Sequence, residues 1–236
     1  MVLEQELHPL YDKHETCLMC KNEFVSKKVR TRFLRIEDVE SDFCPIYKDE
    51  AVSPLLYFNK VCPECGFTFN EQFSPYFPPN TEEEIKHNIS EKWVPHDFSG
   101  ERTYHQAIQT YKLAIYSGQL KNERAIVMAG LELRIAWLYR KMGNETKENR
   151  FLKFALSTLD EAYTESNYTN TDMNDVRVLY LIGELHRRFN DPQKAVYYYS
   201  KVVERQGQTL EHKVIERARE QWHIAREEYK QALNKE

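Results

Sequence analysis

The sequence predicts an α+β protein, in which a small metal-binding β module precedes an all-α domain of helical repeats. Two Cys-x-x-Cys pairs lie in the first third of the chain, and three prolines occupy positions 75–79. Apolar residues recur at the helical period of 3.6 from about residue 101 onward. We therefore divide the chain into a metal-binding module (1–72), a Pro-rich linker (73–80) and a helical repeat domain (81–236) with a C-terminal capping helix.

The two cysteine pairs are spaced as the ligands of a structural metal. Two thiolates separated by two residues reach one metal from a single tight turn, and two such turns complete a tetrahedron. Gly66 permits a positive φ after the second pair, and Asn22 is the residue expected in the left-handed position after the first. A redox-active disulfide is the alternative for a Cys-x-x-Cys turn. The predicted ligands of a structural Zn²⁺ are Cys17, Cys20, Cys62 and Cys65.

The segment between the pairs is long enough for strands of its own, since 41 residues separate Cys20 from Cys62. Alternating polar and apolar residues predict a half-exposed strand at 24–36, and short strands are expected at 55–61 and 67–69. Residues 1–16 are expected to be a polar lead-in, and 37–42 an acidic loop. Short strands around two metal-binding turns are typical of a zinc-ribbon-like module, whose small core would be marginal without its metal.

Cys44 is the fifth cysteine, and three interpretations of it stay open. It is a buried small hydrophobic residue, as free cysteines commonly are. Otherwise it replaces one of the four ligands, or it is a reactive thiol that serves a thiol-based redox or metal sensor.

Composition excludes several classes of protein. Only 7 of 236 residues are glycine, and neither a Walker-type nor a dinucleotide-binding pattern occurs. No stretch approaches the roughly 20 apolar residues of a membrane span. The acidic start lacks the profile of a signal peptide, and cysteines in metal-ligand spacing fit a reducing compartment. We therefore expect a cytoplasmic protein with no membrane association.

Charge argues against nucleic acid as a partner. Residues 1–80 hold 9 Lys or Arg and 13 Asp or Glu, a net charge of −4, whereas residues 81–236 hold 24 of each sign. Nucleic-acid binding needs excess positive charge. The alternating cations Lys28, Arg30 and Arg32 are the one feature that favours a nucleic-acid-binding zinc ribbon, and the local acidic excess weakens it.

Helix signals follow the prolines. Thr81 to Glu84 has the pattern of a capping box. Apolar residues at helical spacing predict helices near 122–142, 151–159, 178–189 and 211–234, and Gly143 is a C-terminal signal.

Residues 179–202 resemble a tetratricopeptide repeat, a helix–turn–helix unit. Gly183 and Ala195 are small where the two helices approach, and Tyr199 is large enough to fill the gap to the next unit. A generic antiparallel helix bundle is the alternative. In a repeat, the first helices of successive units would line a groove for a protein or peptide partner, although an ordinary solvated helix face would look the same. The candidate groove residues are Trp137, Arg140, Lys141, Tyr180, Glu184, Arg187 and Arg188.

Nearly the whole chain resembles the bacterial family called domain of unknown function 2225. The resemblance rests on the ordered set Cys17-x-x-Cys20, Lys27-Lys28-Val29-Arg30, Asp42-Phe43-Cys44-Pro45-x-Tyr47, Pro54-Leu55-x-Tyr57 and Cys62-Pro63-x-Cys65-Gly66, together with the helical half. It implies a bacterial cytoplasmic protein and no established activity.

The pattern as a whole favours a zinc-binding, non-catalytic protein–protein interaction module. Four cysteines leave zinc no open coordination position, whereas a catalytic zinc needs one. His87, His96 and His105 are spaced by nine residues, which fits no single helix face. An enzyme is therefore not expected, and no residue is assigned a catalytic role.

Overall fold

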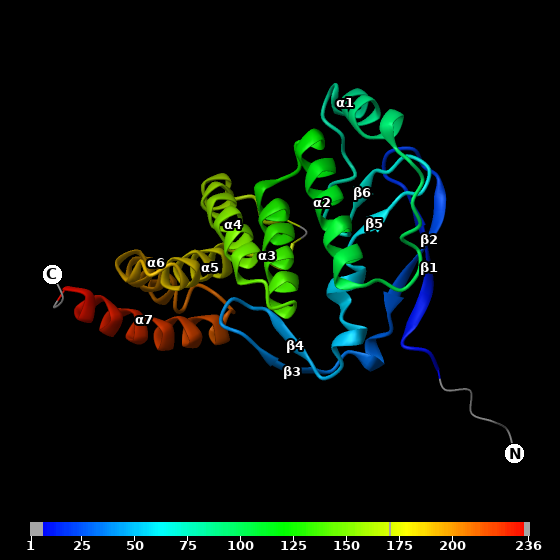
Figure 1. Ribbon diagram of the computed structural model, residues 1–236. Coiled ribbons are helices and arrows are strands. Elements are labelled where there is room, and N and C mark those ends of the chain that lie inside the picture. The colour runs from blue at the N-terminus through cyan, green and yellow to red at the C-terminus, as the bar shows by residue number, and fades with distance from the viewer. Residues whose placement is uncertain (1–6, 170, 234–236) are drawn as a thin grey trace, which may run out of the picture. The chain divides into compact units, whose positions relative to one another are not determined.

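The computed structural model describes residues 7–169 and 171–233 (Figure 1). These residues form two compact units. The first contains residues 7–39, 45–123 and 137–143, and the second contains 40–44, 124–136, 144–169 and 171–233. The division does not fall at residues 73–80. Residues 81–123, which follow the prolines, belong to the first unit together with the cysteine turns.

An antiparallel hairpin opens the first unit. Strand β1 (Leu10–Thr16) pairs with β2 (Glu23–Val29) in a register that sets Leu10 opposite Val29 and Lys13 opposite Ser26. The prediction of a polar lead-in over residues 1–16 is therefore wrong for Leu10–Thr16, while residues 1–6 lie outside the described residues. The sequence did not predict this strand, because Leu10 is its only fully buried residue and the apolar alternation of a strand is missing.

Two further strand pairs follow, so the described residues contain three separate two-stranded sheets. Strand β3 (Ile36–Val39) pairs with β4 (Pro45–Tyr47), and β5 (Lys60–Val61) pairs with β6 (Thr68–Phe69). The expected strand at 24–36 ends at Val29. Half of the expected acidic loop is strand β3. The expected strand at 55–61 begins as a 3-10 turn over Pro54–Tyr57, and only Lys60–Val61 is a strand.

The Pro-rich segment packs into the first unit, although it contains no helix or strand. Phe73 is buried, and both Phe73 and Phe77 contact the ring of the buried Phe67. Helix α1 (Thr81–Asn88) follows, and α2 (Tyr104–Lys121) packs against α1, β5 and β6. The buried guanidinium of Arg102 donates to the carbonyls of Leu56, Asn59 and Phe98, which ties the turn before β5 to the start of α2.

The predicted capping box at Thr81 is wrong. Asn80, with a φ of 69°, precedes the helix without a side-chain cap, and the Thr81 hydroxyl donates to the Pro78 carbonyl instead. A capping box does occur at α2, where Thr103 and Gln106 each accept a backbone N–H of the other.

Helices dominate the second unit. Helix α3 (Ala125–Lys141) contributes residues to both units, and α4 (Glu145–Glu165), α5 (Asp175–Arg188), α6 (Pro192–Glu204) and α7 (His212–Leu233) belong to the second. Neighbouring helices from α4 to α7 pack on one another in chain order (Figure 1). The predicted stop at Gly143 is confirmed, since its φ is 68° and Asn144 caps the next helix.

Small residues decide how closely α5 and α6 approach. A Cβ on Gly183 would lie 3.1 Å from the Tyr199 ring, so glycine permits the contact between these two helices. Tyr199, Tyr180 and Ala195 are each 0 % exposed in the same apolar cluster, to which α7 contributes Val214 and Ile215.

Candidate metal centre and candidate binding face

Two turns of the same construction carry the cysteine pairs. In the first, the Cys17 N–H donates to the Asn22 carbonyl (2.9 Å) and the Lys21 N–H donates to the Cys17 carbonyl (3.1 Å). In the second, Cys62 and Phe67 repeat the first bond (3.1 Å), and Gly66 and Cys62 repeat the second (2.9 Å). The fifth residue of each turn is left-handed, with φ values of 62° for Lys21 and 72° for Gly66. The expected role of Gly66 is confirmed, and the left-handed residue of the first turn is Lys21, not Asn22.

The four sulfur atoms converge as the ligands of one metal ion. The ligand atoms of Cys17, Cys20, Cys62 and Cys65 all lie within 4.8 Å of one another. The Sγ atoms of Cys17 and Cys65 are 3.7 Å apart, and those of Cys20 and Cys62 are 3.6 Å apart. A tetrahedron with Zn–S bonds of about 2.3 Å places its sulfurs about 3.8 Å apart, so these two spacings fit zinc. A disulfide needs about 2.05 Å, and all five cysteines are free.

The chemistry of the cluster also favours a cation. Hydrogen bonds from the Cys17 and Cys65 thiols lower the pKa of Cys62 to about 2, so at least this sulfur is a thiolate. Hydrogen bonding within the cluster raises the pKa values of Cys17 and Cys65, and burial adds to the rise. A bound divalent ion offsets the mutual repulsion of neighbouring thiolates and holds all four sulfurs in that form. An all-sulfur, four-ligand set is closed, which is the arrangement of structural sites.

Trp93 closes the second turn from outside. Its indole Nε1 donates to the Pro63 carbonyl at 2.9 Å, and its ring covers Gly66. A Cβ on Gly66 would lie 2.5 Å from this ring. Glycine is therefore required here both by its left-handed backbone and by the close approach of Trp93.

Cys44 lies outside this cluster. It is 1 % exposed and belongs to the loop 40–44 of the second unit. Its N–H donates to Asp42 and its carbonyl accepts from the Glu40 N–H. Burial of this kind agrees with the interpretation of Cys44 as a small hydrophobic residue.

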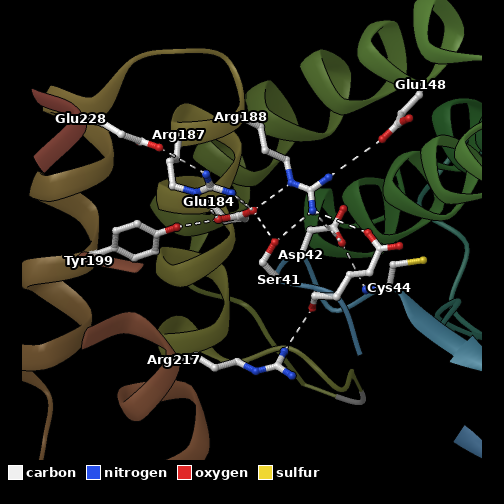
Figure 2. A network of polar contacts seen from close by, with 11 residues as sticks. Ser41, Asp42, Cys44, Glu148, Glu184, Arg187, Arg188, Tyr199, Arg217 and Glu228 are labelled. Atoms are coloured by element: carbon white, nitrogen blue, oxygen red, sulfur yellow. Dashed lines mark hydrogen bonds and ion pairs between the residues drawn. The ribbon is translucent and has the colours of Figure 1, made fainter. Parts of the chain in front are cut away.

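The loop 40–44 and α5 share a network of buried charges (Figure 2). The carboxylate of Glu184 is 0 % exposed and accepts hydrogen bonds from Ser41 (2.6 Å), Tyr199 (2.8 Å) and both Arg187 and Arg188. Burial alone would raise the pKa of Glu184, but the hydrogen bonds from Arg187, Ser41 and Arg188 outweigh it and lower the pKa to about 2. Glu184 therefore stays ionised and fixes both guanidinium groups.

Arg188 contacts the acidic side chains of the loop 40–44. Its guanidinium lies 3.5 Å from the fully buried Asp42 and 3.7 Å from Glu40, and it donates to the Ser41 hydroxyl at 3.0 Å. Figure 2 shows Arg217 reaching the same loop from α7, where it donates to the Glu40 carbonyl at 3.1 Å.

Phe43 supplies the apolar part of the same contact. Its ring stacks on Tyr180 with centroids 5.0 Å apart, and the guanidinium groups of Arg177 and Arg217 lie about 6 Å from the ring centre. Phe43 has a φ of 67°, a strained conformation for an aromatic residue. Such strain persists where surrounding contacts over-determine it, as they do here.

The structure thus brings together four of the seven predicted groove residues, Tyr180, Glu184, Arg187 and Arg188, around a segment of the chain itself. The other three, Trp137, Arg140 and Lys141, fall in the first unit, where Lys141 pairs with Glu50 at 2.6 Å. Sequence reasoning missed Ser41, Asp42 and Phe43 as their counterparts. No local pattern could have found them, because the burial of Asp42 and the contact of this distant segment with α5 are visible only in the folded chain.

The cations that favoured nucleic acid are engaged within the first unit. Lys28 pairs with Glu71 at 3.0 Å, Arg30 donates to the His8 carbonyl and lies over Tyr11, and Arg32 lies over Phe33. Lys28 alone of the three is on a strand. They do not form the expected row along one strand.

None of the helices in the described part of the chain has the length and apolar character to cross a membrane. A family model described as "Uncharacterized protein conserved in bacteria (DUF2225)" matches residues 10–225. No curated protein and no solved structure matches the chain significantly.

Proposed function

Because the chain belongs to this uncharacterised bacterial family, DUF2225, we propose a function from its own geometry: a zinc-stapled, non-catalytic protein that binds a segment of a partner protein. The zinc is structural, and Cys17, Cys20, Cys62 and Cys65 hold it. The helices of the second unit act as a tetratricopeptide-like scaffold. The partner is a protein or peptide, and nucleic acid is disfavoured because the cations of β2 and the turn after it are already engaged.

The observation that carries the interaction is the seating of residues 40–44 on α5. Arginine and aromatic side chains are typical of sites where binding energy concentrates. Here Arg188 and Tyr180 engage an acidic side chain and a phenyl ring that lie side by side in sequence, Asp42 and Phe43. A partner segment with an acidic residue before an aromatic residue would meet the same groups.

The supporting chemistry is specific to acidic segments. Arg187 and Arg188 are both held by Glu184, so their planes are fixed before a ligand arrives. Arg187 also faces Glu228 of α7 at 3.7 Å, while Arg188 faces Glu148 of α4 at 4.0 Å. Arg188 therefore contacts the loop, Glu184 of its own helix and Glu148 of α4.

Peptide binding tests the proposal. The probe is a fluorescent peptide of residues 38–46 with serine in place of Cys44, and the readout is polarisation with zinc-loaded full-length protein. We expect weak binding to the wild type, because the covalently attached loop has a high effective concentration. We expect at least tenfold tighter binding to the Asp42→Ala/Phe43→Ala variant, whose own loop competes poorly.

Arg188→Ala in that variant background should abolish the gain, and Lys201→Ala on the exposed part of α6 is the control that should leave it intact. A peptide that binds neither protein, or binds equally well without Arg188, contradicts the proposal.

A further inference from the structure

A cavity of about 130 Å³ lies within the first unit. The hairpin of β1 and β2 forms one side, and the turn Pro54–Tyr57 and strand β5 form the other. The apolar part of its lining consists of Val29, Leu34, Pro54, Tyr57 and Phe58. The polar and charged part consists of Glu15, Ser26, Lys27, Lys28, Lys60 and Glu71.

Ser26 has an unused hydroxyl at this cavity. The residue is 3 % exposed, and its Oγ has no hydrogen-bond partner among the described residues. A buried hydroxyl without a partner costs about 1–3 kcal/mol. A sequence that keeps serine here, where alanine would fill the same space, points to a group that enters the cavity and accepts that hydrogen bond.

The charges beside Ser26 do not balance. Lys13, Lys28 and Lys60 converge on two carboxylates, those of Glu15 and Glu71, at N–O distances of 3.0–3.6 Å. Lys60 is 8 % exposed, so its ammonium group is largely withdrawn from water. Lys27, which also lines the cavity, pairs with Asp12 at 2.6 Å. Lys28 and Lys60 line the cavity, and Lys13 reaches the same two carboxylates from outside the lining, so three cations against two anions leave one positive charge for a ligand to neutralise.

The volume and the lining of the cavity limit the class of ligand further. A protein cavity of about 150 Å³ holds a benzene molecule, so this cavity accommodates an organic molecule of about six heavy atoms. Phosphate would turn some of its oxygens toward Val29, Leu34 and Pro54, where no donor meets them. A molecule with one anionic end and a short hydrocarbon body matches both the charged and the apolar residues of the lining.

We propose that this cavity binds a small aliphatic monocarboxylate. The carboxylate accepts the Ser26 hydroxyl hydrogen bond and faces Lys28 and Lys60, and the hydrocarbon body packs on Val29, Leu34 and Pro54. The site shares none of its residues with the binding face on α5. Strand β1 ends at the residue before Cys17 and carries Glu15, and β5 ends at the residue before Cys62 and carries Lys60. The ligand would therefore contact both strands that lead into the metal centre.

Three probes of nearly equal size test the charge. Butyrate, n-butanol and n-butylamine are titrated separately into the zinc-loaded full-length protein, and the amide shifts of Ser26, Val29 and Leu34 are followed by NMR. We expect saturable shifts with butyrate, affinity at least about tenfold lower for n-butanol, and no saturable binding of n-butylamine.

Two serine variants test the contact. Ser26→Ala should weaken butyrate binding about tenfold, the effect of losing one hydrogen bond to a charged acceptor. Ser53→Ala is the matched control, because Ser53 is also fully buried with an unpartnered hydroxyl but does not line the cavity. Equal binding of butyrate and n-butanol, tighter binding of inorganic phosphate than of butyrate, or unchanged affinity in Ser26→Ala would each overturn the proposal.

Discussion

Gly66 shows how much one residue decides at the metal centre. Its left-handed backbone shapes the second cysteine turn, and the Trp93 ring occupies the space where any side chain would begin. The equivalent position of the first turn is Lys21, which adopts the same conformation without an overlying ring.

Gly66→Ala should therefore destabilise the protein by about 2–4 kcal/mol, the sum of a strained φ and the displacement of Trp93. Lys21→Gly is the matched change at the first turn and should be neutral or slightly stabilising, since glycine adopts the left-handed backbone freely. Chemical denaturation of the zinc-loaded proteins measures both. A Gly66→Ala protein as stable as the wild type would show that Trp93 does not hold its place.

Glu132 on α3 is a residue whose charge works against folding. Burial, with a further contribution from Glu161, raises the pKa of its carboxyl to about 7, although Thr158 donates a hydrogen bond to it. A folded-state pKa above the unfolded value means that the folded state holds this proton more tightly. The stabilisation is complete below the unfolded pKa of 4.5 and is lost as the pH rises through about 7.

Glu132→Gln, which imitates the protonated form, should therefore raise stability by about 1–2 kcal/mol near pH 8 and by less near pH 6. Thermal unfolding at the two pH values measures the difference. Glu161→Gln at the exposed neighbour is the control, and its effect should be small at both. A gain that does not depend on pH would contradict the raised pKa.

At the scale of elements, the seating of loop 40–44 on α5 rests on one buried carboxylate. Tyr199 on α6 and Tyr180 on α5 are both 0 % exposed, and their rings lie 5.6 Å apart. The Tyr199 hydroxyl donates to Glu184 at 2.8 Å, whereas the Tyr180 hydroxyl has no partner among the residues that the structure describes.

This pair predicts opposite outcomes for the same substitution. Tyr199→Phe should destabilise the protein by about 1.5–3 kcal/mol, because the buried Glu184 carboxylate loses a donor. Tyr180→Phe should be neutral or stabilising, since it removes a buried hydroxyl that has no hydrogen bond. Equilibrium unfolding of the two variants measures the contrast, and equal effects would count against the network as drawn.

The sequence predicted the helices more completely than the strands, for physical reasons. Helices α3 to α7 bury a regular stripe of apolar side chains, and Gly143, Asn144 and Pro192 mark their ends. The partly buried face of strand β1 carries Lys13 and Glu15, which pair with Glu71 and Lys60 far along the chain, so its pattern looked like a polar tail. The capping box at Thr81 was a matching pattern without the matching backbone, because the turn before it is held by the Pro78 carbonyl instead.

The site was predictable where its chemistry is local. The two Cys-x-x-Cys pairs predict four ligands, and in the structure those four sulfurs lie close together. The face on α5 was predictable in part, because Arg187, Arg188 and Glu184 share a helix at spacings of three and four residues. Their occupant was not, since Ser41 lies 143 positions from Glu184 and nothing in the local pattern joins them.

At the scale of the whole molecule, we expect a metal at the four cysteines to contribute much of the stability of the first unit. Its three sheets have only two strands each, and two of them have strands of four residues or fewer. Sheets this small need further support to be stable. A metal bound at four thiolates supplies it, because the binding free energy of a structural zinc becomes folding free energy.

Zinc content together with X-ray absorption at the zinc edge, on protein purified without a metal-affinity tag, tests the central claim most directly. The account predicts about one zinc per chain with four sulfur neighbours at about 2.3 Å. Cys44→Ser should retain that metal, while Cys17→Ser and Cys62→Ser should lose it or bind it far more weakly. A chain free of zinc, a shell with nitrogen or oxygen in place of sulfur, or full zinc retention without Cys17 and Cys62 would contradict it.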